Sequence, residues 1–312
     1  MSSFKKICVL MGGTPNEREV SLVSGKNVAE ALASLGKYEV IPVVLDKDSL
    51  ESLPECDACF LALHGGWGEN GGIQASLDLK KIPYTGPGAN ASRIAMDKIK
   101  TKMILEMNNI STAPWSLAGK GAEASPLALP VVIKPPCDGS SVGISKVSDK
   151  TQWADALECA LNAQGGDGNV LVEEFIPGRE FSVPIINSQV LRPVEIVAES
   201  GWYGFEEKYV SNKTKYHFVD ESEKVFNTNL HRNLCDIALK AYKALSCRSI
   251  TRVDIRVSPM GRAYVLELNT SPGLTSHSLV PMSARECSLE MPQLCEKILS
   301  TAAYGDDWSH HE

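Results

Sequence analysis

No stretch of this sequence approaches the roughly 18–20 consecutive apolar residues that a membrane-spanning helix needs. The first residues, Met1 to Lys6, lead into a short apolar segment without a small-residue cleavage site, so we expect no signal peptide. Basic residues are not in excess, because 31 Lys and Arg stand against 38 Asp and Glu. The net charge of -7 argues against a non-specific nucleic-acid binder. We therefore expect no nucleic-acid partner and no membrane insertion.

Two common nucleotide-binding motifs are also absent. Residues 12–14 read Gly-Gly-Thr and do not form the GxGxxG fingerprint of dinucleotide-binding enzymes. The small-residue loop at 138–143 is not followed by the Gly-Lys-Ser/Thr of a Walker A loop. The first absence speaks against a nucleotide-binding oxidoreductase, although that class stays open as an alternative at this point.

Cysteine is present but shows no disulfide pattern. The nine cysteines are odd in number and are scattered from Cys8 to Cys295, as expected for reduced thiols in the cytoplasm. Cys56 and Cys59 have the spacing of redox or zinc motifs, but no second pair completes a four-cysteine zinc site. We interpret both as half-buried strand residues and predict a cytoplasmic protein.

The composition is that of a folded globular protein, with 43% hydrophobic and 22% charged residues among 312. This length suggests about two domains, or three smaller lobes. Residues 4–90 alternate predicted strands and helices, which indicates βαβ units and a parallel sheet. Ligands of such sheets bind at the carboxyl ends of the strands, where glycine-rich loops lie at 12–14 and 64–72. The predicted strands are 6–11, 38–45 and 57–63, and the predicted helices are 21–35 and 73–81.

The rest of the chain mixes strands and helices without a repeat. Residues 91–176 begin with one predicted long helix, 91–108, and contain strands at 130–134 and 170–176. Residues 177–312 contain strands near 181–187 and 190–197, a polar aromatic loop at 202–219, a helix near 229–245 and a hairpin at 251–269. The alternation of apolar and polar residues in this hairpin carries the clearest chemical signal of the sequence.

The hairpin pattern predicts two carboxylates on one polar face. We expect a four-residue turn that places Val257 opposite Arg262. In that register Arg252 lies opposite Glu267, and Asp254 and Glu267 are diagonal neighbours with backbones about 7–8 Å apart. The apolar residues Val253, Ile255, Val257, Tyr264, Leu266 and Leu268 would then share the core face.

Two interpretations of this polar face stay open. Carboxylates at that spacing, with Asn269 further along the strand, suit Mg²⁺ or Mn²⁺ and can bridge two ions about 3.5–4 Å apart. The alternative is an exposed face with an ordinary ion pair between Arg252 and Glu267. The loop at 270–279 favours the first interpretation, because its hydroxyls and backbone N–H groups suit an anionic ligand.

A second loop suits phosphate groups. Gly139, Ser140 and Ser141 follow the strand that ends in Lys134, and the N–H groups and hydroxyls of such a loop can close over phosphates. Lys98 and Lys134 are either phosphate-binding cations or solvated surface lysines. Lys134 is the stronger candidate because it ends an apolar strand.

These segments recur, in the same order, in one enzyme family. They are Gly12-Gly13-Thr14 with Glu17 to Ser21, Leu63-His64-Gly65 with Gly68-Glu69, Met96-Asp97-Lys98, Lys134 with Gly139 to Gly143, Glu173 to Glu180, Glu207-Lys208-Tyr209, Arg252-Val253-Asp254 and Glu267 to Gly273. With this set the sequence resembles the D-alanine–D-alanine ligases of the ATP-grasp superfamily over nearly the whole chain. Asp138 and Pro184 depart from the family's usual residues, at positions where we expect little effect on the chemistry.

The resemblance implies an α/β protein with α+β lobes and the ATP-grasp fold. Residues 1–90 would form an N-terminal Rossmann-like parallel-sheet domain that binds substrate. Residues 91–176 would form the central lobe with the phosphate-covering loop, and residues 177–312 the C-terminal lobe with the metal site and a mobile loop. ATP would be clamped between these two lobes. A homodimer is also implied.

The implied activity joins two D-alanine molecules for peptidoglycan precursor synthesis. ATP would phosphorylate the carboxylate of one D-alanine, and the amine of the second would attack the acyl phosphate and release phosphate. Oxyanion donors such as Arg252 and the Gly273 backbone are worth about 3–4 kcal/mol each in such a reaction. Glu17 would bind the ammonium of the first D-alanine, and Tyr209 would close the site through a hydrogen bond to Ser140.

The remaining implied roles concern ligand binding. ATP would be bound by Lys98, Lys134 and Ser141, by Glu173, Glu174 and Ile176 around the adenine, and by Glu180 at the ribose. Two magnesium or manganese ions would be bound by Asp254, Glu267 and Asn269. D-alanine would be bound by His64, Ser278 and Leu279.

Two alternatives remain beside this prediction. A near one is another ATP-grasp ligase that uses D-lactate or D-serine as second substrate, and a distant one is a non-catalytic nucleotide-binding protein. The intact carboxylates and Arg252 disfavour the latter. Tyr209 favours D-alanine, because relatives that use D-lactate carry a different residue there and a tyrosine with a pKa of about 10 is neutral at pH 7.

Overall fold

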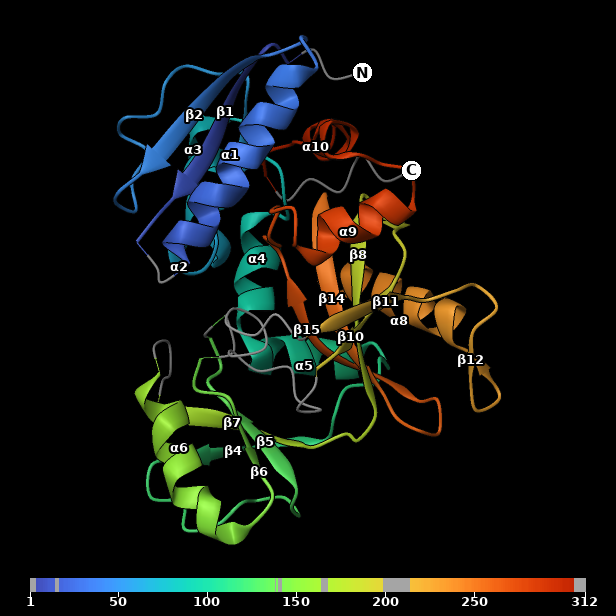
Figure 1. Ribbon diagram of the computed structural model, residues 1–312. Helices are drawn as coiled ribbons and strands as arrows, with labels where there is room; N and C mark the ends of the chain where they lie inside the picture. Colours follow the sequence, from blue (N-terminus) through green and yellow to red (C-terminus); the bar gives the residue numbers. More distant parts are fainter. Residues whose placement is uncertain are drawn as a thin grey trace.

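The apolar strands of the N-terminal part form a parallel sheet in the computed structural model, which describes residues 4–14, 17–137, 139, 142–163, 168–198 and 214–305. The strands β1 (Lys6–Gly12), β2 (Glu39–Leu45) and β3 (Ala58–Leu61) have the order β2-β1-β3, which confirms the predicted parallel sheet. Helices α1 (Arg18–Ser34) and α3 (Gly72–Lys80) cover its opposite faces, and α2 (Gly66–Glu69) precedes α3 (Figure 1).

Alternation along β1 explains the two covered faces. Ile7 and Val9 pack in the same core as α1, whereas Cys8 and Leu10 pack in the same core as α3. Successive side chains of a strand point to opposite faces, so a strand buried on both sides is apolar throughout.

The predicted long helix at 91–108 is wrong, because the chain forms two helices that meet at Asp97. They are α4 (Ala89–Met96) and α5 (Lys98–Met107), and they run in different directions (Figure 1). Asp97 is extended, with φ -89° and ψ 101°, and its side chain accepts a hydrogen bond from the N–H of Lys100 at 3.0 Å. Asp is a favoured N-cap residue and therefore starts a new helix within an otherwise helical pattern.

The second sheet is antiparallel. Its order is β4-β7-β5-β6, with β4 (Trp115–Gly119), β5 (Val131–Lys134), β6 (Ser145–Val147) and β7 (Asn169–Glu174). A 3₁₀ turn (Lys150–Gln152) leads into α6 (Trp153–Asn162), whose buried Trp153 and Leu157 pack with Val131 and Ile133. The sequence predicted β5 and β7 but missed β4, β6 and α6.

The third sheet holds the hairpin. Its order is β11-β10-β8-β14-β15, and a short β9 also pairs with β8. The strands are β8 (Arg179–Ile186), β9 (Gln189–Val190), β10 (Val194–Val197), β11 (Lys215–Phe218), β14 (Ile250–Val257) and β15 (Ala263–Asn269). A small antiparallel pair, β12 (Lys224–Val225) and β13 (Thr228–Asn229), precedes α8 (Leu230–Ala244), which packs on the sheet.

Hydrophobic packing cuts across the predicted lobes. Ala91 and Ala95 of α4 and Leu105 of α5 belong to the core of the third sheet, together with Leu234 of α8 and Val253 of β14. The lobe boundaries at 90/91 and 176/177 stay a prediction.

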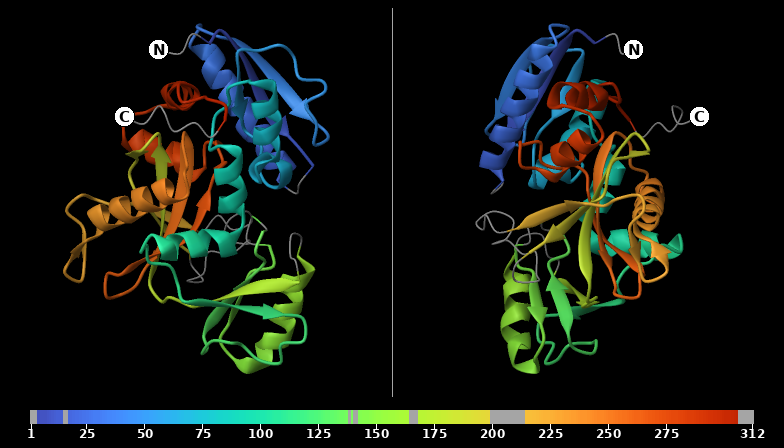
Figure 2. Two further views of the ribbon diagram at one scale, coloured as in Figure 1. Left: turned by 180° about the vertical axis from the view of Figure 1, so that it is seen from behind. Right: turned by 45° about the vertical axis from the view of Figure 1, so that its right-hand side comes forward.

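The end of the described chain returns to the N-terminal sheet. Helices α9 (Leu279–Glu286) and α10 (Met291–Leu299) follow the hairpin, and α10 lies beside α1 in both views of Figure 2. Leu294 and Ile298 of α10 share a core with Val28 and Leu32 of α1. The first and last parts of the chain therefore depend on each other for burial.

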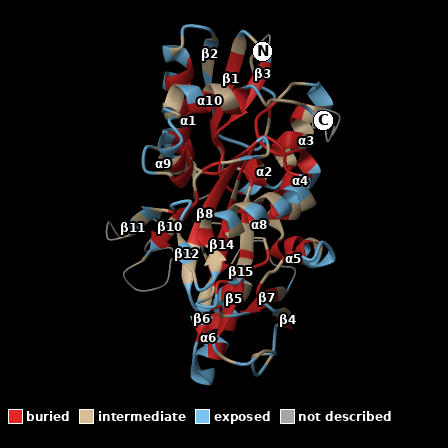
Figure 3. Ribbon diagram, turned by 90° about the vertical axis from the view of Figure 1, so that its right-hand side faces the viewer, coloured by how far each residue is buried: buried red, intermediate tan, exposed pale blue. Residues whose placement is uncertain are grey.

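Buried residues run through the strands, and exposed residues line the outer helix faces and the loops (Figure 3). Within the ranges given above, no helix is both long and apolar enough to cross a membrane.

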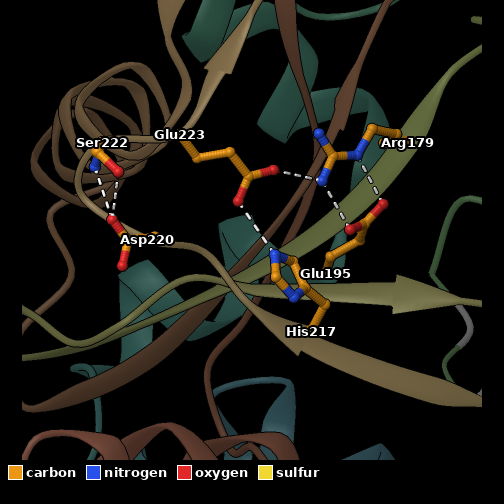
Figure 4. A network of polar contacts seen from close by, with 6 residues as sticks. All are labelled: Arg179, Glu195, His217, Asp220, Ser222 and Glu223. Atoms are coloured by element: carbon orange, nitrogen blue, oxygen red, sulfur yellow. Dashed lines mark hydrogen bonds and ion pairs between the residues drawn. The ribbon is translucent and has the colours of Figure 1, made fainter.

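A polar network fastens the outer strands of the third sheet (Figure 4). Arg179 on β8 contacts both carboxylate oxygens of Glu195 on β10 at 2.7 Å and also Glu223 at 2.7 Å. The other oxygen of Glu223 lies 3.0 Å from Nε2 of His217 on β11. Arg179 and His217 hold the pKa of Glu223 below its usual value, although burial acts in the opposite direction. The network joins β8, β10 and β11 to the segment before β12.

Candidate active site

The hairpin register differs from the predicted one because β15 contains a bulge. Asp254 lies directly opposite Glu267, and Arg252 lies directly opposite Asn269. The register shifts after Asp254, which leaves Leu266 as the extra residue of β15. The diagonal arrangement of the two carboxylates is therefore wrong. Directly opposed residues share one face of a sheet, so the carboxylates still face each other.

The bulge also changes the predicted turn and core. Val257 pairs with Ala263 rather than with Arg262, so the turn is one residue longer than expected. An extra residue in a strand switches the face of the sheet to which the side chains beyond it point. The buried positions of β15 are accordingly Ala263, Val265 and Leu268, whereas Tyr264 and Leu266 are only partly buried.

Asp254 is held by two neighbours. The guanidinium of Arg252 donates to it from Nε to Oδ1 at 2.9 Å and from Nη2 to Oδ2 at 2.8 Å. The hydroxyl of Ser182, which pairs with Asp254 across β8 and β14, donates to Oδ1 at 2.8 Å. Sequence reasoning gave Ser182 no role. Its position opposite Asp254 in the strand pairing is the signal that identifies it.

The other two predicted metal ligands lie close by. The Nζ of Lys98, at the start of α5, is 3.7 Å from Oε2 of Glu267. The Oδ1 of Asn269 accepts the N–H of Ser271 at 3.0 Å, which fixes the amide at the start of the following loop. Lys98 of α5 therefore meets Glu267 of β15, and Asn269 lies two residues further along the same strand.

A pocket opens between the second and third sheets. It encloses about 650 Å³ of empty space, its open mouth included. The second sheet contributes charged residues from the ends of β5 and β7, and the third sheet contributes them from β8, β14 and β15. The lining includes Val132, Lys134, Glu173, Glu174, Phe175, Ile176, Glu180, Asp254, Arg256, Leu266 and Glu267. Most of the residues predicted for ATP thus surround one cavity together with two of the metal candidates.

Glu173 lies between two buried lysines at the pocket wall. Its Oε1 is 2.6 Å from Nζ of Lys102 on α5, and its Oε2 contacts Nζ of Lys134 on β5. Burial acts to raise the pKa of Glu173, but the two ammonium groups outweigh it and hold this pKa below the usual value. Burial likewise acts to lower the pKa of Lys134, and nearby carboxylates, Glu173 foremost, raise it instead. Burial lowers the pKa of Lys102, although the Glu173 carboxylate acts in the opposite direction.

The opposite wall is organised by Arg256, which the sequence did not single out. Its guanidinium donates to the carbonyl of Ile176 at 2.6 Å and to Glu180 at 2.9 Å. It also stacks on the ring of Phe175, 5.0 Å from the ring centre, and Lys146 covers the same ring at 3.8 Å. Arg256 pairs with Glu180 in the register of β8 and β14, so the predicted ribose ligand is fixed by its neighbour strand.

His64 links the N-terminal sheet to the loop after β15. Its Nδ1 lies 2.9 Å from the carbonyl of Ser271, and its Nε2 lies 3.0 Å from Oγ of Ser24. A carbonyl can only accept, so Nδ1 carries the ring proton, and Nε2 of the neutral ring accepts from the hydroxyl of Ser24. The same hydroxyl oxygen accepts the N–H of Leu274 at 3.2 Å. Burial lowers the pKa of His64, in keeping with a neutral ring that carries its proton on Nδ1. His64 therefore holds the loop in place, next to the predicted substrate site.

Glu17 and Glu69 gather near His64 and Arg252. Glu17 precedes α1, and its Oε1 would be 3.4 Å from a Cβ added to Gly139, so it faces the predicted phosphate loop. Glu69 is buried and accepts the N–H of Gly65 at 2.7 Å. Burial raises the pKa of Glu69 to about 7, with the charge of Glu17 adding to the effect and Arg252 opposing it. Sequence reasoning quoted Glu69 but gave it no role.

The loop after Asn269 is tightly packed. A Cβ on Gly273 would lie 2.8 Å from Oγ of Ser278, so a larger residue there would require this hydroxyl to move. The Oγ of Ser278 accepts the N–H of Thr275 at 3.1 Å. The side chain of Leu279 packs with Val194 and Ile196, which leaves its backbone at the start of α9 as the part available to a ligand. Ser140, Ser141 and Tyr209 lie outside the residues that the structure describes.

The assembled site combines three chemical capabilities. The pocket offers cations for phosphates and an apolar wall for a base. The opposed carboxylates with Asn269 offer hard oxygen ligands. Arg252 and the loop after Asn269 offer donors for a developing negative charge. Together they suit the transfer of a phosphoryl group to a carboxylate.

Comparisons with known proteins agree with this chemistry. A family model described as "D-ala D-ala ligase C-terminus" matches residues 103–300. A D-alanine–D-alanine ligase of Acidovorax ebreus is 40% identical over 309 residues, which cover 96% of this chain and 91% of that protein. One from Pelobacter propionicus is 39% identical over 310 residues, which cover 96% of both chains.

Solved structures of such ligases have a similar fold. A D-alanine–D-alanine ligase from Bacillus anthracis, complexed with ATP, matches with a TM-score of 0.81 and 30% identity over 95% of this chain and 97% of its own. The VanG D-Ala:D-Ser ligase from Enterococcus faecalis matches with a TM-score of 0.81 and 27% identity, covering 95% of this chain and 99% of its own.

Proposed function

Because this chain belongs to the D-alanine–D-alanine ligase family, we propose that the residues around its pocket perform the family's reaction in the roles described below. The protein is an ATP-dependent ligase with the ATP-grasp fold, and it makes D-alanyl-D-alanine for peptidoglycan synthesis. The single observation that carries this function is the identity of about 40% over 96% of the chain. ATP phosphorylates the carboxylate of one D-alanine, giving D-alanyl phosphate and ADP. The amine of a second D-alanine then displaces phosphate and forms the peptide bond.

The pocket between the second and third sheets is the proposed ATP-binding site. The Glu173 carboxylate lies in the pocket lining, with its Oε1 2.6 Å from Nζ of Lys102, and each carboxylate oxygen can accept more than one hydrogen bond. An acceptor of this kind fits the amino group of adenine, with Ile176 and Glu174 beside the base. Glu180 is the proposed ribose ligand. Lys98, Lys134 and Ser141 would bind the phosphates, since charge-assisted contacts to phosphate are strong.

Asp254, Glu267 and Asn269 fit two magnesium or manganese ions. Two opposed carboxylates and an amide oxygen are hard ligands, and the described residues contain no group of three or more His, Cys, Asp or Glu that would compete with them. Asp254 would share its carboxylate between an ion and Arg252. Bound ions would neutralise charge on the transferred phosphoryl group.

The D-alanine sites lie between the N-terminal sheet and the loop after β15. Glu17 would bind the ammonium of the first D-alanine, next to His64. Ser278 and the backbone of Leu279 would bind the second. Arg252 and the N–H of Gly273 would stabilise the oxyanion when the amine attacks. Tyr209 would hydrogen-bond Ser140 and close the site.

The second substrate, the oligomeric state and the compartment are further parts of the proposal. Tyr209 supports D-alanine as the second substrate, and the Enterococcus D-Ala:D-Ser ligase shows that the same fold serves a different partner. The family resemblance supports a homodimer. The odd number of scattered cysteines supports a location in the cytoplasm. Phosphate release from ATP, compared for D-alanine, L-alanine, D-serine and D-lactate, tests the substrate. We expect phosphate release to be faster with D-alanine than with L-alanine, D-serine or D-lactate. Equal rates of release with D-alanine and L-alanine would contradict the assignment.

A further inference from the structure

Lys102 is a buried ammonium behind the wall of the nucleotide pocket. It lies on α5, and its side chain is 1% exposed. Its Nζ donates to Oγ1 of Thr112 at 2.7 Å and to the carbonyl of Ala113 at 3.0 Å. The hydroxyl of Thr112 in turn donates to the carbonyl of Val265 on β15 at 2.8 Å. Lys102 is therefore fixed to the segment that runs from the third sheet into the second.

Lys102 and Lys134 hold the two oxygens of one carboxylate. Glu173, 2% exposed, is 2.6 Å from Lys102 through Oε1 and contacts Lys134 through Oε2. Lys134 and Glu173 line the pocket, and Lys102 reaches Glu173 from α5. The charges that face this cluster are Glu106 on α5, Glu267 on β15 and Glu180 on β8. Two lysine side chains thus contact one carboxylate, although a single positive charge would be enough to balance its charge.

The second cation becomes necessary if Lys134 binds phosphate. An ammonium that turns toward phosphate oxygens leaves Glu173, and a buried carboxylate without a counter-ion is costly. Without another counter-ion, the Glu173 carboxylate would either hold Lys134 away from the phosphate or take up a proton. Lys102, anchored by Thr112 and Ala113, stays at Glu173 in either case.

We propose that Lys102 is a positioning residue that keeps Glu173 ionised and in place when Lys134 binds phosphate, and that it thereby sets the preference for adenine over hypoxanthine. The inference rests on the proposed seat of adenine at Glu173. Adenine carries an amino donor where hypoxanthine carries a carbonyl acceptor. An ionised carboxylate accepts from the first and repels the second, whereas a protonated carboxyl can donate to the second. A site built for one hydrogen-bonding pattern discriminates strongly against the other.

The test compares ATP with inosine triphosphate in D-alanine-dependent phosphate release. Lys102→Gln removes the charge but keeps an N–H donor for Thr112 and Ala113. We expect it to raise KM for ATP at least about tenfold and to change KM for inosine triphosphate much less, so that the preference for ATP falls by about the same factor. Lys102→Arg keeps the charge and should retain most of the preference. Lys100→Gln, on the same helix but ion-paired with Asp97 at the surface, should match the wild type.

Two outcomes overturn the role of Lys102. One is an unchanged preference in folded Lys102→Gln. The other is an equal rise of both KM values, which a merely structural residue would produce. If Lys102→Gln does not fold, Thr112→Val takes its place, because it removes one anchor of the ammonium. It should lower the preference in the same direction, and an unchanged preference again overturns the role.

Glu173→Gln separates this inference from the proposed nucleotide site. If Glu173→Gln leaves the preference for ATP intact, adenine does not bind at Glu173 and the proposed base site is wrong. If Glu173→Gln lowers the preference and Lys102→Gln does not, the base site stands and only the role of Lys102 is wrong.

Discussion

Arg252 and Asp254 form a two-point ion pair within one strand, with 2.9 Å from Nε to Oδ1 and 2.8 Å from Nη2 to Oδ2. The pair joins the proposed oxyanion donor to a proposed metal ligand. Planar contacts of this kind fix orientation as well as charge. An ion held by Asp254 would therefore also act on the direction in which Arg252 points.

This pair predicts that a charge-conserving change at Arg252 is not tolerated. Arg252→Lys cannot make the planar two-point contact. We expect kcat for D-alanine-dependent phosphate release to fall about 10²–10³-fold, as for loss of an oxyanion donor. Arg262→Lys, exposed in the turn of the same hairpin, is the control and should keep wild-type rates. Near-normal turnover by Arg252→Lys would remove Arg252 from the reaction.

Because the carboxylates of Asp254 and Glu267 lie opposite each other, we predict that turnover requires a carboxylate at Glu267. Glu267→Gln should abolish magnesium-dependent turnover, because an amide oxygen carries no charge to balance the cation. The melting temperature should change little, since Glu267 is only partly buried. Titration of turnover with magnesium, alongside Glu158→Gln on the exposed face of α6, checks this. A Glu267→Gln protein that regains full turnover at higher magnesium would show that the site binds without this carboxylate.

Gly178 predicts a large loss of stability at the edge of the pocket. It has a φ of +134°, and an added Cβ would lie 2.0 Å from the carbonyl oxygen of Val257. Gly178→Ala should therefore lower the free energy of unfolding by about 2–4 kcal/mol.

Gly36 supplies the matched control, because its φ is +65° and nothing lies within 4 Å of an added Cβ. Gly36→Ala should cost only about 1 kcal/mol, the conformational part alone. Urea unfolding of both variants checks the difference. Equal losses would show that the contact with Val257 relaxes without cost.

Glu69 predicts a stability difference that depends on pH. Its pKa is raised to about 7, so the stability it contributes is present below its unfolded pKa and is lost as pH rises through about 7. Glu69→Gln removes this titration. The stability of Glu69→Gln relative to the wild type should therefore increase from pH 5 to pH 8, by at most about 3 kcal/mol.

His64 does not disturb this comparison, because both proteins contain it. Its pKa is lowered, so its own contribution is present at high pH and is lost as pH falls below the ordinary value of about 6.5. Melting temperatures of the two proteins at several pH values supply the measurement. A constant difference across the range would show that Glu69 is ionised throughout.

The sequence predicted the parts of the fold that depend on local patterns. The strands and helices around the N-terminal sheet follow from apolar alternation and glycine-rich turns, and the convergence of Lys134, Glu173 and Glu180 on one pocket follows from the family motifs. The hairpin register was wrong because a bulge at Leu266 leaves no mark in the alternation of the flanking strands.

Other features depend on contacts between distant segments. The break at Asp97 required recognising an N-cap inside a helical pattern. Lys102 looks like one of several lysines on α5, and only the packing of α5 against Glu173 distinguishes it. Arg256 and Ser182 are visible only through the pairing of β8 with β14.

The most direct test of the account follows an oxygen atom. If ATP phosphorylates the carboxylate of D-alanine, one carboxylate oxygen leaves with the phosphate when the second amine attacks. Incubation with ATP and D-alanine labelled with ¹⁸O in the carboxylate, followed by mass spectrometry of the phosphate, measures this transfer. The account predicts one labelled oxygen in each phosphate released, together with D-alanyl-D-alanine as the product. Unlabelled phosphate formed alongside the dipeptide would contradict it.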